Sequence, residues 1–171
     1  MQAYNAQIAV DSASQVIVAA EVTQETNDKK QLLPMIAQIE TNLEQKPEKV
    51  SADTGYFSEA NVTDESVKEV DLYVATGRDK HGEVVEPNSD PPHGAPPKEA
   101  MRFNLRTAAG RAVYKMRKAI VEPVVGQIKE QRGFRRFSLR GKENVSREWK
   151  LVCAVSNLLK LFRADWGLEM A

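Results

Sequence analysis

The chain has 171 residues, 24 lysines and arginines against 24 aspartates and glutamates, and one cysteine, Cys153. This length suits one domain rather than two, and one cysteine excludes an intrachain disulfide. The sequence shows neither the long apolar run of a membrane span nor the basic and apolar regions of a secretory leader, so a cytoplasmic location is expected.

The zero net charge conceals a separation of charge along the chain. Residues 1–100 hold 8 lysines and arginines against 18 aspartates and glutamates, whereas residues 101–163 hold 16 against 4. A surface this basic attracts phosphate, so the second part of the chain predicts a nucleic-acid partner. The alternative is that the acidic and basic parts neutralise each other within the fold.

The first half of the chain predicts alternating strands and helices. Alternating apolar residues over 4–22 predict a β-hairpin with its turn at 11–15. Asn27 and Asp28 are placed to cap a helix that ends before Pro47 and buries one apolar face, formed by Leu32, Met35, Ile36 and Ile39. A strand at 49–53, a short helix capped by Ser58 that runs to about Val67, and a strand at 70–76 follow.

Residues 77–100 contain five prolines and predict an irregular loop. Two helices are then expected, one over about 107–131 and one over about 146–163. The first should bury Val113, Met116, Ile120 and Val124, and the second carries an apolar stripe of Trp149, Val152, Val155, Leu159 and Phe162. The order of elements favours an α/β fold with one mixed sheet covered by helices.

Asp53 is a candidate metal ligand because it follows a short strand, and ligands in α/β folds gather at the carboxyl ends of strands. The simpler interpretation is a turn aspartate that accepts a hydrogen bond from its own backbone before Gly55.

Glu122 is the second candidate, since it is the one carboxylate on a helix face that also presents Arg111, Lys115, Lys118 and Lys129. Surface ion pairs are the alternative explanation. Pro123 either kinks the helix and aims this carboxylate, or marks a junction between two helices.

Residues 132–141 interleave arginines with Phe134 and Phe137. Arg135 and Arg136 suit phosphate contact, and anchoring of the two rings in the core would be compatible with that role.

Three motifs in this order resemble the DDE transposases of bacterial insertion sequences. They are Tyr-Asn-Ala-Gln-Ile-Ala-Val-Asp at 4–11, Ala-Asp-Thr-Gly-Tyr at 52–56, and Arg-Lys-x3-Glu-Pro-x2-Gly-x2-Lys-x3-Gly-Phe-Arg-Arg-Phe at 117–137. The likeness covers about residues 4–163. It implies an RNase H-like fold whose three carboxylates hold two divalent ions, Mg²⁺ or Mn²⁺, that cleave DNA and transfer the strand.

The resemblance assigns the second carboxylate to Asp53 and the third to Glu122, as catalytic and metal-binding residues. It also implies DNA contacts from the basic helix and the segment after it: Tyr114, Arg117, Lys118, Lys129, Arg135 and Arg136. The family's Tyr-x2-Arg-x3-Glu-x6-Lys signature is displaced here, because four residues separate Arg117 from Glu122.

The family's first aspartate lies on a strand that precedes the hairpin, and Asp11, in the hairpin turn, is a poor substitute. Residues 1–171 are therefore expected to form a partial catalytic domain that lacks the first strand and is inactive alone. Its expected partners are DNA and either a second copy of the chain or an upstream transposase half. The alternative function is a non-catalytic DNA-binding remnant or regulator of transposition. A protein-interaction module with mutually neutralising halves is a third.

Overall fold

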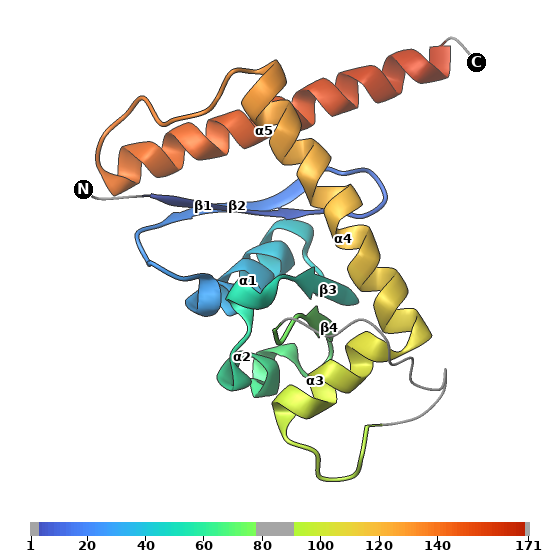
Figure 1. Cartoon of the computed structure of the whole chain (residues 1–171). Coiled ribbons are helices and arrows are strands. Elements are labelled where there is room, and N and C mark those ends of the chain that lie inside the picture. The colour runs from blue at the N-terminus through green and yellow to red at the C-terminus, as the bar shows by residue number, and fades with distance from the viewer. Residues whose placement is uncertain (1–3, 78–90, 170–171) are drawn as a thin grey trace. The chain divides into compact units, whose positions relative to one another are not determined.

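The computed structural model describes residues 4–77 and 91–169, and its contacts divide the chain into two compact units (Figure 1). The hairpin unit comprises the chain up to Thr26 together with the chain from Ile120 onward, and the central unit comprises Asn27–Ala119. The assignment of residues 1–171 to one catalytic domain stays a prediction.

The predicted hairpin forms the start of the hairpin unit. Strand β1 (Asn5–Val10) pairs antiparallel with β2 (Ile17–Thr23), with a register shift between Ala9 and Val10. Asp11 organises the turn: its Oδ2 accepts hydrogen bonds from the backbone N–H groups of Ala13 and Ser14 at 3.1 and 2.7 Å, and from the Ser14 hydroxyl at 2.7 Å. This carboxylate therefore serves the turn, as expected for aspartate there.

Helix α5 (Lys142–Glu169) packs on the hairpin at β2 (Figure 1). The Trp149 indole N–H donates to the carbonyl of Gln7 at 3.0 Å. The Asn157 side-chain amide forms two hydrogen bonds with the backbone of Ile17. It accepts from the N–H and donates to the carbonyl, both at 2.8 Å. The buried core beneath contains Ile17, Ala20, Val22, Val124, Ile128, Val145, Trp149 and Cys153.

In the central unit, a 3-10 turn, η1 (Asp28–Lys30), leads into α1 (Leu32–Leu43). Leu32, Met35, Ile36 and Ile39 are buried, so the predicted buried face is confirmed. The predicted cap differs, because Asn27 caps the 3-10 turn η1, and α1 begins after Gln31 without a side-chain cap. Strands β3 (Lys49–Ala52) and β4 (Asp71–Val74) pair in parallel, from Lys49 with Asp71 to Ala52 with Val74.

The connection between these strands differs from the expected single helix. The 3-10 turn η2 (Thr54–Tyr56) precedes α2 (Glu59–Thr63), which Ser58 caps as predicted. Asp64 ends α2 in an extended conformation and caps a separate 3-10 turn, η3 (Glu65–Val67). An aspartate that bonds the backbone N–H two residues on stops a helix, because it starts a new turn.

The predicted loop over 77–100 extends too far toward the carboxyl end, because its last residues are helical. Residues 78–90 lie outside the described residues, but helix α3 (Pro97–Arg106) begins within the predicted loop and packs against β4. Pro97 occupies the first helical turn, where a missing N–H has no cost. The expectation that the prolines exclude helix up to residue 100 is therefore wrong.

Helix α4 (Ala108–Gly126) continues through Pro123 and is followed by a π-helical turn, η4 (Gln127–Gln131). Pro123 is therefore not a junction between two helices. The expectation that Met116 is buried is wrong, since its side chain is 54% exposed, whereas Val124 and Ile128 are buried. On α5 the predicted apolar stripe reaches the core only at Trp149 and Val152, and Phe162 is 58% exposed.

The described strands pair as β1 with β2 in the hairpin unit and as β3 with β4 in the central unit. The one mixed sheet that the sequence favours would join strands of both units and stays a prediction. The α/β composition is as expected, and the RNase H-like assignment stays a prediction. None of the described helices is both long enough and apolar enough to cross a membrane.

Candidate metal and DNA-binding site

Asp53 lies directly after β3 and caps the turn η2. Its Oδ1 accepts a hydrogen bond from the Gly55 N–H at 2.9 Å, which is the turn contact that the local sequence favours. This bond leaves Oδ2 outside the turn, and half of the side chain is exposed to solvent. The turn role and a ligand role are thus compatible, because each uses a different oxygen.

The second oxygen of Asp53 faces Arg117 of α4, with 3.9 Å between Oδ2 and Nη1. The Arg117 side chain is 22% exposed, and its guanidinium lies over the Tyr114 ring at 5.3 Å from the ring centre. Tyr114 itself packs against the core of the central unit. The predicted DNA contacts Tyr114 and Arg117 are therefore brought together with Asp53 inside this unit.

A further carboxylate, Asp28, approaches the same turn. A Cβ placed on Gly55 would lie 3.1 Å from Oδ1 of Asp53 and 3.2 Å from Oδ2 of Asp28, so the two acidic groups flank this glycine. Burial raises the pKa of the Tyr56 hydroxyl, and the nearby charges of Asp28 and Asp53 raise it further. Sequence reasoning assigned Asp28 only to helix capping, and no spacing rule connects residues 28 and 53.

Glu122 is exposed on α4 within the hairpin unit, as its place in the helical pattern predicted. Lys118, one turn earlier on the same helix, is exposed in the central unit. The expected approach of Glu122 to Asp53 is a relation between the two units and stays a prediction.

The remaining predicted DNA contacts lie together in sequence within the hairpin unit. Lys129 is exposed in η4, and Arg135 and Arg136 are exposed in the segment that follows. Arg135 forms an ion pair with Glu130, a neighbour that sequence reasoning did not identify. These cations face solvent, where a phosphate backbone can reach them.

The rings of this segment anchor it to the core. Phe134 stacks on Trp149 with 6.0 Å between ring centres, and Phe137 meets Trp149 edge-on at 6.2 Å. The predicted combination of rings anchored to the core and exposed arginines is therefore what residues 134–137 show, with both rings partly buried.

Glu148 of α5 fixes the rest of this segment, and sequence reasoning missed it. Its carboxylate accepts hydrogen bonds from the backbone N–H of Ser138 at 2.9 Å and of Leu139 at 3.1 Å. A glutamate in a basic helix gives no sequence signal for a bond to a loop ten residues earlier. The bonds hold the backbone just after Arg136 in place.

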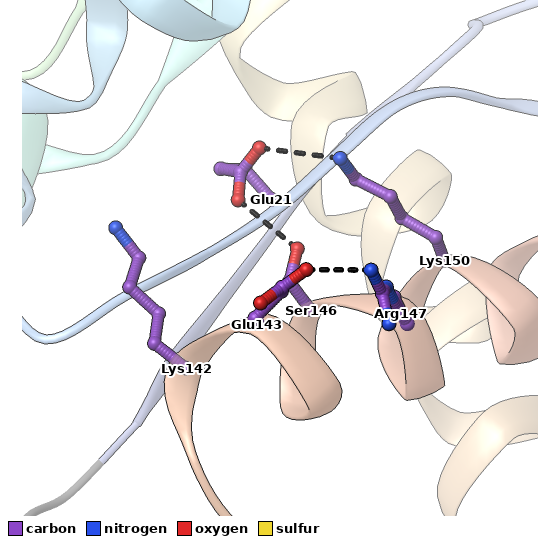
Figure 2. A pocket seen from close by; sticks show the side chains of 6 residues that line it. All are labelled: Glu21, Lys142, Glu143, Ser146, Arg147 and Lys150. Atoms are coloured by element: carbon purple, nitrogen blue, oxygen red, sulfur yellow. Dashed lines mark hydrogen bonds and ion pairs between the residues drawn. The ribbon is translucent and has the colours of Figure 1, made fainter.

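An open hollow of about 460 Å³ lies beside the start of α5, lined by Glu21, Lys142, Glu143, Ser146, Arg147 and Lys150 (Figure 2). Glu21 reaches Lys150 at 3.6 Å and Ser146 at 3.3 Å, while Glu143 pairs with Arg147 at 2.5 Å. Its acidic and basic groups thus largely satisfy one another, and no predicted site residue lines it.

The donor chemistry of Asp53 fits a hard divalent cation, because carboxylate oxygens are what Mg²⁺ prefers and Oδ2 accepts no hydrogen bond within the described turn. Among the described residues, no three histidine, cysteine, aspartate or glutamate side chains gather closely enough to hold a metal ion.

Comparison with known proteins places this region in a family. The family model described as a transposase DDE domain matches residues 78–162, about half of the chain, which include α3, α4, η4 and most of α5. No curated protein and no solved structure matches the chain. The matched segment carries Glu122 and the predicted DNA contacts, and the chain belongs to the DDE transposases of the insertion-sequence type.

Proposed function

We propose that this chain serves DNA transposition by metal-dependent DNA cleavage and strand transfer, with Asp53 and Glu122 as two of the carboxylates that hold Mg²⁺ or Mn²⁺. The observation that carries the proposal is the family match over the helix that bears Glu122. The Oδ2 of Asp53, which lies at the end of β3 on a half-exposed side chain and is not used by the turn bond, supports it. A complete site is expected to hold two ions, which would activate the attacking oxygen and stabilise the leaving one.

The chain's own contribution is to orient ligands and to hold DNA. The Gly55 N–H fixes one oxygen of Asp53, and the other lies toward Arg117. Lys118, Lys129 and Arg136 are exposed cations, and Arg135 joins them if it exchanges Glu130 for phosphate. Such contacts position DNA without reading its sequence.

The direct test is nicking of supercoiled plasmid DNA in the presence of Mn²⁺. It uses the chain alone and the chain extended at its amino end by a strand that carries an aspartate. We expect Mn²⁺-dependent nicking by the extended chain, and loss of at least about 100-fold on Asp53→Asn or Glu122→Gln, which is typical of removing a catalytic group.

Glu40→Gln is the matched control, because Glu40 is an exposed helical glutamate outside the proposed site. It should leave the nicking rate unchanged. Nicking that survives Glu122→Gln would refute the assignment of that residue.

The second candidate function is DNA binding without cleavage, as a remnant or regulator of transposition. The exposed cations Lys129 and Arg136 support it, because phosphate contact needs no metal site. Two results together would support this function. The chain would bind DNA in EDTA, and neither the chain alone nor the extended chain would nick DNA in Mn²⁺. A cytoplasmic location, and a second copy or an upstream transposase half as partner, remain predictions.

A further inference from the structure

The contact between Arg117 and Asp53 has an unusual geometry. At 3.9 Å the guanidinium and the carboxylate attract each other, but the distance exceeds that of a hydrogen bond. Arg117 also has a buried Nε that finds no hydrogen-bond partner among the described residues. The guanidinium thus lies beside the carboxylate without forming a hydrogen bond to it at this distance.

Tyr114 explains why the guanidinium stays there. The ring lies three residues earlier on α4, so one helical turn brings it under Arg117, and the cation lies 5.3 Å from the ring centre. Because Tyr114 packs against the core of the central unit, the platform is fixed. The position of the cation is therefore set by α4, independently of Asp53.

A divalent ion on Oδ2 of Asp53 would meet this guanidinium as a like charge. The two cations cannot both lie against the same oxygen without strong repulsion. Arg117 has a natural alternative partner, since phosphate binds arginine with two charge-assisted hydrogen bonds. The Nη1 that faces Asp53 lies beyond hydrogen-bond distance from it, at 3.9 Å, so this nitrogen can make that exchange.

We propose that Arg117 is a positioning residue that holds the Asp53 carboxylate while DNA is absent and frees it for metal when a DNA phosphate takes up the guanidinium. This inference rests on the proposed function, because it gives Asp53 a metal to bind. It makes Arg117 a coupling element between DNA and metal rather than a DNA contact alone.

The test is a double-mutant cycle on DNA affinity in EDTA, measured by fluorescence anisotropy of a short labelled DNA duplex. Asp53→Asn frees Arg117 and should raise the affinity about threefold, the strength of a half-exposed ion pair. In the Arg117→Gln background this increase should disappear. In the Arg117→Lys background part of it should return, since the charge is kept.

Lys115→Gln is the matched control, because Lys115 is exposed on the same helix and its removal changes the charge equally. Asp53→Asn should raise the affinity as much in that background as in the unaltered chain. An equal increase in the Arg117→Gln and Lys115→Gln backgrounds would mean general charge repulsion and would overturn the proposal. Circular dichroism of each variant reports folding.

Mn²⁺ binding to the DNA-free chain, followed by electron paramagnetic resonance, separates this proposal from the proposed function. Arg117→Gln should raise Mn²⁺ affinity about threefold and Asp53→Asn should abolish binding. Binding that depends on Asp53 but is unchanged in Arg117→Gln overturns only the role of Arg117. Binding that ignores Asp53→Asn overturns the metal role of Asp53 and the coupling with it.

Discussion

Trp149 is the side chain on which the contacts of the hairpin unit converge. It is 7% exposed, its indole N–H bonds the carbonyl of Gln7, and its ring meets Phe134 and Phe137. Trp149→Ala should lower the free energy of unfolding by about 3–5 kcal/mol, because it leaves a large cavity and an unpaired carbonyl. Urea denaturation followed by circular dichroism measures the decrease.

Leu151, two residues along the same helix, provides the control. It is 65% exposed, so Leu151→Ala should change the free energy of unfolding by less than about 0.5 kcal/mol. A decrease from Leu151→Ala as large as that from Trp149→Ala would show that the described packing of α5 on the hairpin is wrong.

Cys153 gives a prediction about pH. Burial raises the pKa of its thiol from 9.0 to about 12, so the folded chain keeps the thiol form that an unfolded chain begins to lose near pH 9. The associated stability is complete below pH 9 and declines as pH rises toward 12. Alkylation by iodoacetamide at about pH 8 should be about a thousandfold slower than in urea, as mass spectrometry can measure.

Cys153→Ala supplies the check on this alkaline effect. The variant should lose less stability than the unaltered chain as the pH rises from about 9 to about 11. Rapid alkylation of the folded chain near neutral pH would mean that Cys153 is accessible rather than buried.

At the residue scale, the sequence predicted contacts that are local. The bond of Asp53 to the Gly55 N–H follows from an aspartate before a glycine, and Phe134 and Phe137 were expected to anchor their loop. The approach of Arg117 to Asp53 could not be predicted, because these residues are distant in sequence and only the fold brings them together. The same holds for Asp28 beside Gly55.

Between elements, the junction of α3 and α4 depends on Gly110. A Cβ there would lie 1.9 Å from the carbonyl oxygen of Asn104, and Thr107 bonds both Asn104 and the Gly110 N–H. Gly110→Ala should therefore destabilise the chain by about 1–3 kcal/mol through overpacking, despite the higher helix propensity of alanine. Thermal unfolding measures the effect.

Gly126 is the matched control for this substitution. It has helical angles, φ −59° and ψ −45°, and nothing lies within 4 Å of an added Cβ. Gly126→Ala should accordingly stabilise the chain by about 0.5–1 kcal/mol. If Gly110→Ala stabilises the chain as Gly126→Ala is expected to do, the close approach at Gly110 is refuted.

Helices were predictable where burial follows periodicity. In α1 every buried apolar position was identified, since one face of a short helix meets the core. In α5 the apolar period continues beyond the part that the hairpin covers, so Val155, Leu159 and Phe162 are 41%, 39% and 58% exposed. Periodicity identifies an apolar face, but tertiary packing decides how much of it is buried.

For the whole molecule, the separated charge predicts salt-sensitive DNA binding. Each phosphate that the chain neutralises should add about 0.9 to the slope of log affinity against log salt. A triple variant should flatten that slope by about 0.9 for every phosphate that the three replaced side chains bind. It combines Lys129→Gln, Arg135→Gln and Arg136→Gln. Titrations of a DNA duplex at several NaCl concentrations measure it.

The control for this triple variant removes three cations from the acidic part of the chain: Lys46, Lys49 and Lys68. Lys46 and Lys68 pair with Glu69 and Glu65, so replacing them should leave the slope nearly unchanged. Equal flattening of the slope by both triple variants would mean that the slope follows net charge rather than contacts at residues 129–136.

The order of most elements was predictable at this largest scale, whereas their assembly was not. Strand and helix patterns are local properties of the chain, but the pairing of strands depends on contacts between distant segments. The parallel pairing of β3 with β4 is such a contact, and one mixed sheet that includes the hairpin stays a prediction.

The hairpin unit joins the two ends of the chain, as the bonds of Asn157 to Ile17 show across 140 residues. During synthesis β1 and β2 leave the ribosome long before α5 is made, because the whole central unit lies between them in sequence. Until α5 has been made, the apolar residues of the hairpin that pack against it are exposed, which leaves the nascent chain open to chaperones and to aggregation.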